Sequence, residues 1–166
     1  MRIFITSGTF PYLINIIKQH PNEQLLLLHN NNSSLLLHES EHTTLFKAAR
    51  KYEVIVQTGP LKQEGYVAMY HIPVNPEGQS VFEHAYKQHL KQLATQTGLR
   101  AIRFLRPLGS ESYIILTQWN EESAFKAWEA STSFISLQDL KLPKGSAQKL
   151  FTGDPFYSKY SVPTID

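Results

Sequence analysis

The chain has 166 residues, of which 42% are hydrophobic and 18% charged, with a formal net charge of +2 and no cysteine. This composition is that of an ordinary folded protein and excludes a disordered or fibrous chain, and the small charge provides no basic stripe for nucleic acid. Disulfides, thiolate nucleophiles and thiolate metal ligands are excluded. Apolar runs are far shorter than the roughly 20 residues of a membrane span, so we expect no membrane segment, no secretory signal and a cytoplasmic location.

The first part of the chain predicts a strand, a helix and a hairpin. Residues 2–6 form a short strand, and Pro11 suits the first turn of a helix that continues to residue 19. The apolar run 25–29 is a strand, and 35–38 is its return strand. The order β-α-β-β is half of a ferredoxin-like unit.

Residues 39–50 are polar and are expected to be irregular. A strand is predicted over residues 51–58, although its alternation of apolar and polar side chains is imperfect. Gly59 and Pro60 end it, and residues 61–65 have the composition of a linker. A further strand is predicted over residues 66–74.

The next stretch predicts helix, strand, strand, helix. Ser80 and Glu83 have capping-box spacing at the start of a helix over residues 80–94, and Gly98 follows its end. Strands are predicted over residues 99–107 and 113–119.

Asn120 is placed to cap the last helix, whose inner face carries Phe125 and Trp128. This helix is expected to bend near residues 131–133 and to run on through residue 138, and residues 150–160 predict a broken terminal strand. The whole chain is therefore expected to be an α+β protein containing the split β-α-β unit of ferredoxin-like folds.

Beyond this pattern, the chain resembles the antibiotic-biosynthesis-monooxygenase (ABM) family, and within it the HmoB-type haem-degrading monooxygenases and their TRAP-like relatives. The resemblance is carried by short segments spread over the chain: Ile5–Thr9, Tyr52–Ile55, Gly65, Phe82, Gly98-Leu99, Arg103–Pro107, Tyr113–Thr117, Trp119 and Ala124–Trp128. It implies a ferredoxin-like ABM domain over residues 63–166. Residues 1–62 are then a β-α-β-β half-unit that completes a dimeric-α+β-barrel-like arrangement within one chain, which implies a monomer.

The resemblance also implies a site. HmoB-type enzymes use an Asn on the strand before the first ABM helix, a Trp on the last helix, and an axial iron-ligating His ten residues beyond that Trp. In this sequence the three positions hold Tyr70, Trp128 and Gln138. Catalytic roles therefore fall on Trp128 and Tyr70, and all three residues are candidates for binding haem.

Each of these residues has a second interpretation. Trp128 lies on an apolar stripe and is equally consistent with simple core packing, while Gln138 is consistent with a solvent-facing helix residue. An amide is a poor ligand for haem iron, whereas the phenol of Tyr70 belongs to a class of known haem ligands. We therefore expect haem to be held weakly.

Histidines elsewhere offer no obvious replacement for the missing ligand. Strand alternation places His71 on the face opposite Tyr70. His84 and His89 are assigned to the polar side of their helix. The His38–His42 loop, with two histidines and two glutamates, is interpreted as a polar hairpin edge rather than a metal site.

The resemblance implies an oxidoreductase that cleaves haem oxidatively with O2, with haem as both cofactor and substrate and with electrons from an external donor. Two alternatives stay open. One is a regulatory, TRAP-like protein that binds haem or another ligand without turnover. The other is a cofactor-free ABM oxygenase acting on a flat aromatic molecule, with Tyr70 as a hydrogen-bonding or acid/base group.

Overall fold

The computed structural model describes residues 1–109, 112–131 and 150–166. The described elements are, in chain order, β1 (Arg2–Gly8), α1 (Phe10–Gln19), β2 (Gln24–His29), β3 (Ser34–Ser40), β4 (Arg50–Thr58), β5 (Tyr66–Ile72), the 3-10 turn η1 (Pro76–Gly78), α2 (Gln79–Leu93), β6 (Leu99–Pro107), β7 (Tyr113–Trp119), α3 (Glu122–Glu129) and β8 (Phe156–Ser161). None of the described helices is long and apolar enough to cross a membrane.

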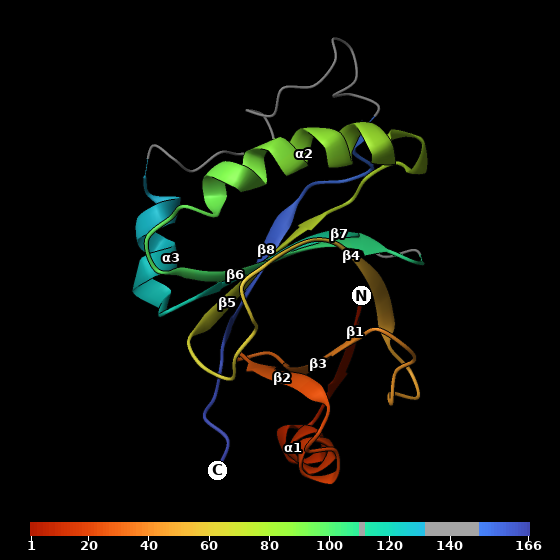
Figure 1. The fold of residues 1–166 in the computed structure, drawn as a ribbon, viewed down its shortest axis with the longest axis vertical. Coiled ribbons are helices and arrows are strands. Elements are labelled where there is room, and N and C mark those ends of the chain that lie inside the picture. Colours follow the sequence, from red (N-terminus) through yellow and green to blue (C-terminus); the bar gives the residue numbers. More distant parts are fainter. Residues whose placement is uncertain (110–111, 132–149) are drawn as a thin grey trace.

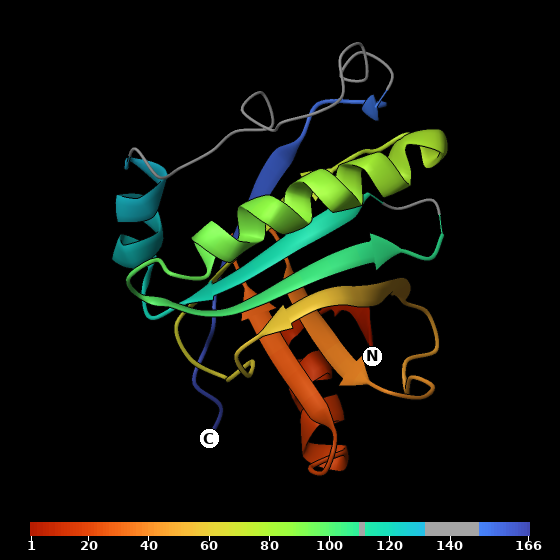
Figure 2. The same ribbon diagram turned by 45° about the horizontal axis from the view of Figure 1, so that its top comes forward.

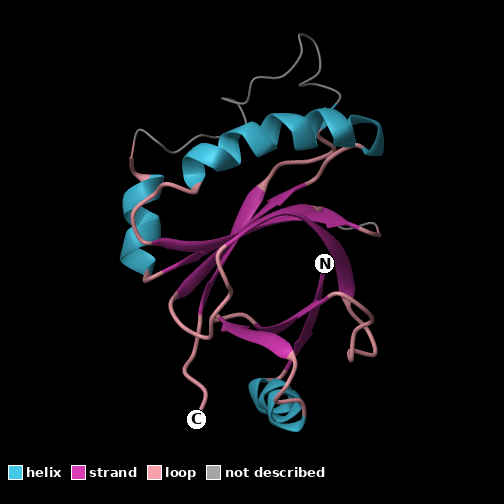
Figure 3. Cartoon of the chain, viewed as in Figure 1, coloured by secondary structure: helices cyan, strands magenta, loops and turns pink. Residues whose placement is uncertain are grey.

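The described strands close into one barrel in the order β1-β3-β2-β8-β5-β7-β6-β4. Every neighbouring pair is antiparallel. Helices α2 and α3 lie outside the barrel on one side and α1 lies outside it on the opposite side (Figures 1 and 3). Turning the molecule shows α2 running along the sheet formed by β6, β7 and β5 (Figure 2). This architecture confirms the predicted α+β fold of two ferredoxin-like halves that share one barrel.

Strand alternation divides the apolar side chains between the barrel interior and the two helix layers. The interior cluster takes one parity of each strand, as Val67 and Met69 of β5 illustrate. The opposite parity packs under α2 and α3, as Ala68 and Ile72 do. A smaller cluster lies beneath α1, where Leu13 meets Leu27 and Leu36.

The imperfect alternation of β4 has a structural cause. The register of β4 against β6 shifts between Val54 and Val56, which marks a β-bulge. Tyr52 and Val54 belong to the interior cluster, but Ile55 and Val56 both contact the cluster under the helices. The extra residue therefore turns the second half of the strand toward the other face.

Both predicted helix caps on the C-terminal side are wrong. Helix α2 follows η1 directly and has no side-chain cap hydrogen bond, and Asn75 caps η1 instead by accepting from the Glu77 backbone N–H. Asn120 does not cap α3, because its side chain accepts a hydrogen bond from Arg100. In the N-terminal half, Pro11 lies in the first turn of α1, as predicted, and Thr9, which the sequence analysis did not single out, caps the helix.

Glu83 attaches α2 to the sheet rather than capping the helix. Its carboxylate accepts two hydrogen bonds of 2.7 Å from Arg106 of β6 and a further one from the Tyr113 hydroxyl of β7. Burial raises the pKa of Glu83, but the hydrogen bonds from Arg106 and Tyr113 outweigh it and hold that pKa below its usual value. The folded state therefore favours the ionised carboxylate.

A second ion pair lies in the barrel interior and joins the two halves. The Arg103 side chain is 1% exposed, and its Nε donates to the Glu39 carboxylate of β3 at 2.7 Å. Its Nη1 also donates to the carbonyls of Thr58 and Gly59 at 3.0 and 2.8 Å. Gly59 has φ of +67°, and a Cβ there would meet the Arg100 carbonyl, so only glycine suits the turn that presents these carbonyls.

The C-terminal end follows the prediction in part. β8 is preceded by an isolated bridge between Val74 and Phe151, so the terminal strand is broken as expected. The described part of α3 ends at Glu129, and the predicted bend and continuation to Gln138 fall on residues outside the described ranges.

We expect Arg103→Met to lower the free energy of unfolding by about 3–5 kcal/mol, because it leaves the Glu39 carboxylate buried without its partner. Arg100→Met, on the same strand, removes a solvent-exposed pair with Glu64 and should cost at most about 1 kcal/mol. Urea denaturation of both variants measures the difference. Equal losses would show that the interior ion pair stabilises the fold no more than the exposed one.

The lowered pKa of Glu83 predicts that part of the free energy of unfolding is lost in acid. Because its folded-state pKa lies below the ordinary 4.5, its contribution is present above that value and is lost as the pH falls through the lower folded-state pKa. We expect Glu83→Gln to lower the free energy of unfolding at neutral pH by about 1–2 kcal/mol and to flatten its decline in acid. An unchanged acid slope in the variant would contradict this assignment.

We also expect the protein to be a monomer, because the described strands close into a barrel and leave no open edge among them for a second ABM chain to complete. Light scattering should give a mass near 19.0 kDa, whereas a stable species of about twice that mass would contradict the prediction.

Candidate functional site

Tyr70 lies on β5 and faces the helix layer. It shares this face with Ala68 and Ile72 and packs against the cluster beneath α2 and α3. On β8 its partner in register is Tyr157, and the two rings stack with centroids 4.4 Å apart at 24°. Both tyrosines are half-buried, and burial raises the pKa of Tyr70. The phenol is therefore protonated at neutral pH.

His71 faces the other way, as strand alternation predicts. Its Nε2 lies 2.6 Å from the Ser158 hydroxyl, and its ring stacks on Phe156 at 4.5 Å. Burial, with a smaller contribution from the positive charge of Arg50, lowers the pKa of His71 to about 4. This imidazole is neutral and is on the opposite face of β5 from Tyr70.

Trp128 lies on the sheet-facing side of α3 and is 7% exposed. Its ring packs on Trp119 of β7 at 5.5 Å and on Phe125 at 6.0 Å. Phe125 in turn contacts Tyr157 at 5.6 Å. Trp128 and Tyr70 therefore belong to one aromatic cluster, with Phe125 and Tyr157 between them.

Gln138, the third candidate, lies outside the described residues.

The structure adds Tyr157 and Tyr86, which sequence reasoning missed, to this group. Burial is the main cause that raises the pKa of each. Tyr157 and Tyr70 add to it for Tyr86, and Tyr70 and the negative charge of Glu129 add to it for Tyr157. We call the residues Tyr70, Tyr86, Phe125, Trp128 and Tyr157 the aromatic wall. No local spacing in the sequence connects Tyr86 or Tyr157 with Tyr70, so neither had a sequence signal of function.

The assignment of His89 to the polar side of its helix is wrong. Its side chain is buried, at 8% exposed, and its ring meets the Tyr86 ring edge-on at 5.3 Å. Seven residues on a helix turn through almost two full turns, so His89 falls within about 20° of Phe82 on the sheet-facing side. His84, in contrast, is exposed, as predicted.

His38, Glu39 and Glu41 of the His38–His42 loop each bind a different partner. His38 contacts the Glu23 carboxylate at 2.8 Å and the Thr44 hydroxyl at 3.0 Å. Glu39 pairs with Arg103, and Glu41 pairs with the N-terminal amine. Within the described ranges, no group of three or more histidines and carboxylates is placed to hold a metal ion.

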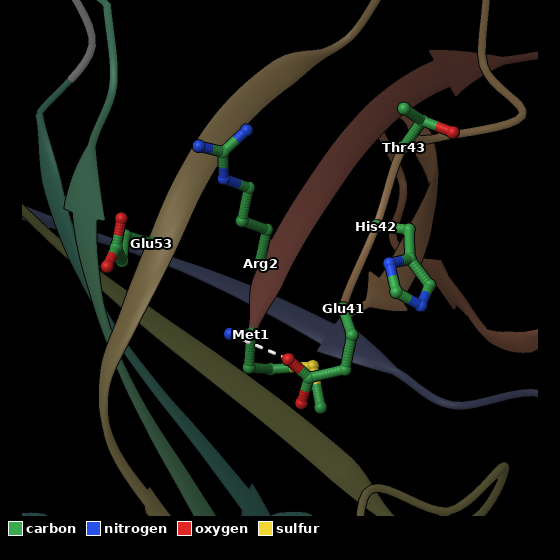
Figure 4. A pocket seen from close by; sticks show the side chains of 6 residues that line it. All are labelled: Met1, Arg2, Glu41, His42, Thr43 and Glu53. Carbon is green, nitrogen blue, oxygen red and sulfur yellow. Dashed lines mark ion pairs between the residues drawn. The ribbon is translucent and has the colours of Figure 1, made fainter.

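Two cavities with described linings contain no residue of the aromatic wall, although Lys159, which borders the second, lies with its Nζ 5.4 Å from the Phe125 ring centroid. One, of about 460 Å³, is polar and is formed by Met1, Arg2, Glu41, His42, Thr43 and Glu53 (Figure 4). The other, of about 720 Å³, lies beside the start of α3 and is bordered by Tyr66, Lys126 and Lys159 among others. Neither contains the candidate residues Tyr70 and Trp128.

Comparison with known proteins gives a family match for part of the chain and relatives for most of it. Residues 65–139 match the family model described as antibiotic biosynthesis monooxygenase. A haem-degrading monooxygenase of Listeria monocytogenes is 25% identical over 156 residues, which cover 94% of this chain and 93% of that protein. The signal transduction protein TRAP of Staphylococcus aureus is 24% identical over 139 residues, which cover 80% of each chain.

A solved structure supports the fold. The crystal structure of a ferredoxin-fold protein related to antibiotic biosynthesis monooxygenases, also from Listeria monocytogenes, superposes with a TM-score of 0.78 at 24% identity and covers 99% of this chain and 95% of that one. Residues 65–139 thus match the antibiotic biosynthesis monooxygenase model, and most of the chain is similar to relatives that include a haem-degrading monooxygenase and TRAP.

Proposed function

We propose that the protein is a monooxygenase that binds a flat aromatic molecule against the aromatic wall, with haem as the first candidate ligand. The observation that carries the proposal is that the two candidate residues with described positions, Tyr70 and Trp128, lie in one cluster although they come from distant parts of the chain. The half-buried rings of Tyr70 and Tyr157 give this cluster an accessible face for stacking.

The described residues of the wall are better suited to contact the haem plane than to ligate its iron. They offer ring faces and protonated phenols, but the raised pKa of Tyr70 disfavours the phenolate that would bind iron. Tyr70 is also bulkier than asparagine and is already stacked on Tyr157, which fills the strand side of the wall. Haem would thus be held loosely, by stacking and hydrogen bonds.

Within this proposal, the chain contributes binding and orientation. Trp128 is held rigidly between Trp119 and Phe125 and borders the ligand, while the Tyr70 hydroxyl donates a hydrogen bond to it. Bound haem would itself supply the activation of O2, with electrons from an external donor.

A second candidate function is a regulatory protein that binds a ligand without turnover. It is favoured by the near-equal identity to TRAP, at 24%, and to the haem-degrading monooxygenase, at 25%. A fold shared by both kinds of protein does not decide between them.

Titration with hemin tests the proposal. We expect the unaltered protein to give a weak Soret band and slow or no haem degradation with ascorbate and O2. Gln138→His introduces an imidazole at the position that ligates iron in the family and should strengthen the band. Tyr70→Asn combined with Gln138→His should also bring degradation closer to that of the family, because it reopens the strand side of the wall.

Tyr12→Asn is the matched control, since Tyr12 is a 58% exposed tyrosine on α1, remote from the wall. It should leave hemin binding unchanged. Tight, catalytically active hemin binding by the unaltered protein would show that its iron ligand is another residue, and indifference of the double variant to hemin would count against haem as the ligand.

A further inference from the structure

The cavity of about 720 Å³ beside the start of α3 has no part in the function proposed above. It lies where the ends of β2 and β8 meet, through the pair His29 and Ser161. Its lining is mostly polar or charged and comes from segments distant in the sequence: 29–31, 65–66, 120–122, 126 and 159–161. The cavity is therefore built by both halves of the fold and is distinct from the aromatic wall.

Tyr66 presents an unpartnered hydroxyl to this cavity. The residue is 6% exposed, and its ring centroid lies 5.8 Å from that of Phe125. Among the described residues the hydroxyl has no hydrogen-bond partner. Its oxygen is not fully enclosed by protein, so it faces the cavity that Tyr66 borders. Because polar atoms of buried side chains nearly always have a partner, we expect one from an occupant of the cavity.

Charges of both signs border the cavity in equal number. They are the ammonium groups of Lys126 and Lys159 and the carboxylates of Glu121 and Glu122. Lys126 pairs with Glu122 at 3.0 Å, but the two side chains are 64% and 53% exposed. Lys159 lies 4.0 Å from Glu129. Such exposed pairs contribute little to stability, so these groups can turn toward a ligand at little cost. A ligand that carries both charges suits this lining best.

The field around Tyr66 assigns the two ends of such a ligand. Burial, and then the negative charges of Glu122 and Glu129, raise the pKa of Tyr66 to about 12. The phenol is therefore protonated at neutral pH, and its oxygen lies in a negative field that favours the positive end of a ligand. The negative end then falls to Lys126 and Lys159.

We propose that this cavity binds a small zwitterion, a molecule that carries one ammonium and one carboxylate group as an α-amino acid does. The ammonium donates to the Tyr66 hydroxyl oxygen and pairs with Glu122, and the carboxylate pairs with Lys126 and Lys159. Binding here does not depend on the aromatic wall, because none of its residues lines the cavity.

Three probes with one side chain separate the two charges. L-Serine is a zwitterion, L-serinamide keeps only the ammonium, and N-acetyl-L-serine keeps only the carboxylate. Titration at about pH 6 keeps every ammonium protonated, and the shifts of backbone amide NMR signals report both affinity and location. We expect L-serine to shift the signals of the lining segments. It should bind about tenfold more tightly than either derivative, because each derivative lacks one charged partner.

Tyr66→Phe should weaken L-serine binding about tenfold. In the absence of probe it should unfold at an unchanged urea concentration, because the hydroxyl that it removes has no partner among the described residues. Tyr12→Phe is the matched control, since Tyr12 is 58% exposed on α1 and does not border the cavity, and it should preserve binding.

Lys126→Gln combined with Lys159→Gln should abolish the preference for L-serine over L-serinamide, because it removes both partners of the carboxylate. Lys91→Gln, at an exposed position of α2, should preserve that preference.

Three results would overturn the proposal. The first is L-serine binding no tighter than that of the derivatives, the absence of all binding included. The second is a Tyr66→Phe variant that binds L-serine like the unaltered protein, or that loses much of its stability, which would assign the hydroxyl a structural role. The third is a set of shifted signals confined to residues away from the cavity.

Discussion

The closure of the described strands into one antiparallel barrel is the constraint on which the rest of the structure depends. In a closed sheet, each strand must place alternate side chains in a shared interior and the others on the outside. The same short segments therefore build the barrel core, the support for α1 and the surface beneath α2 and α3. A shift of one residue in any strand would exchange these roles.

This constraint also determines where chemistry is placed. Tyr70 and His71 are neighbours in sequence, yet one enters the aromatic wall and the other the barrel interior. The interior is tied together by the Arg103–Glu39 pair, which connects strands from the two halves. The helix side is tied by Glu83, which anchors α2 to β6 and β7 and thereby positions Tyr86 and His89.

The protonation of the wall bears on the kind of reaction it supports. Burial raises the pKa values of its tyrosines and lowers that of His89, so these groups are uncharged at neutral pH, while the Lys159 ammonium lies over the rings of Phe125 and Tyr157. Such a surface favours a planar, largely apolar ligand recognised through a few hydrogen bonds. It is equally compatible with turnover and with ligand sensing, which agrees with the enzymatic and regulatory relatives of this chain.

The sequence by itself determined the ferredoxin-like order of elements, the bounds of β6 and β7, and the opposite orientation of Tyr70 and His71. Each depends on local periodicity or on turn residues, which can be recognised within a single segment of the sequence. It also pointed to the ABM family through short motifs. It did not predict the β-bulge in β4. The imperfect alternation of apolar and polar side chains in that segment is a consequence of the bulge.

Only the tertiary structure decided which residues meet across the chain. The stacking of Tyr70 on Tyr157 depends on the register of β5 against β8, and the Arg103–Glu39 pair depends on closure of the barrel. Burial of His89 and the use of Glu83 as a tether instead of a cap depend on how α2 packs against the sheet. Local pattern assigns a side chain to a face, but its partners are set by packing between segments distant in sequence.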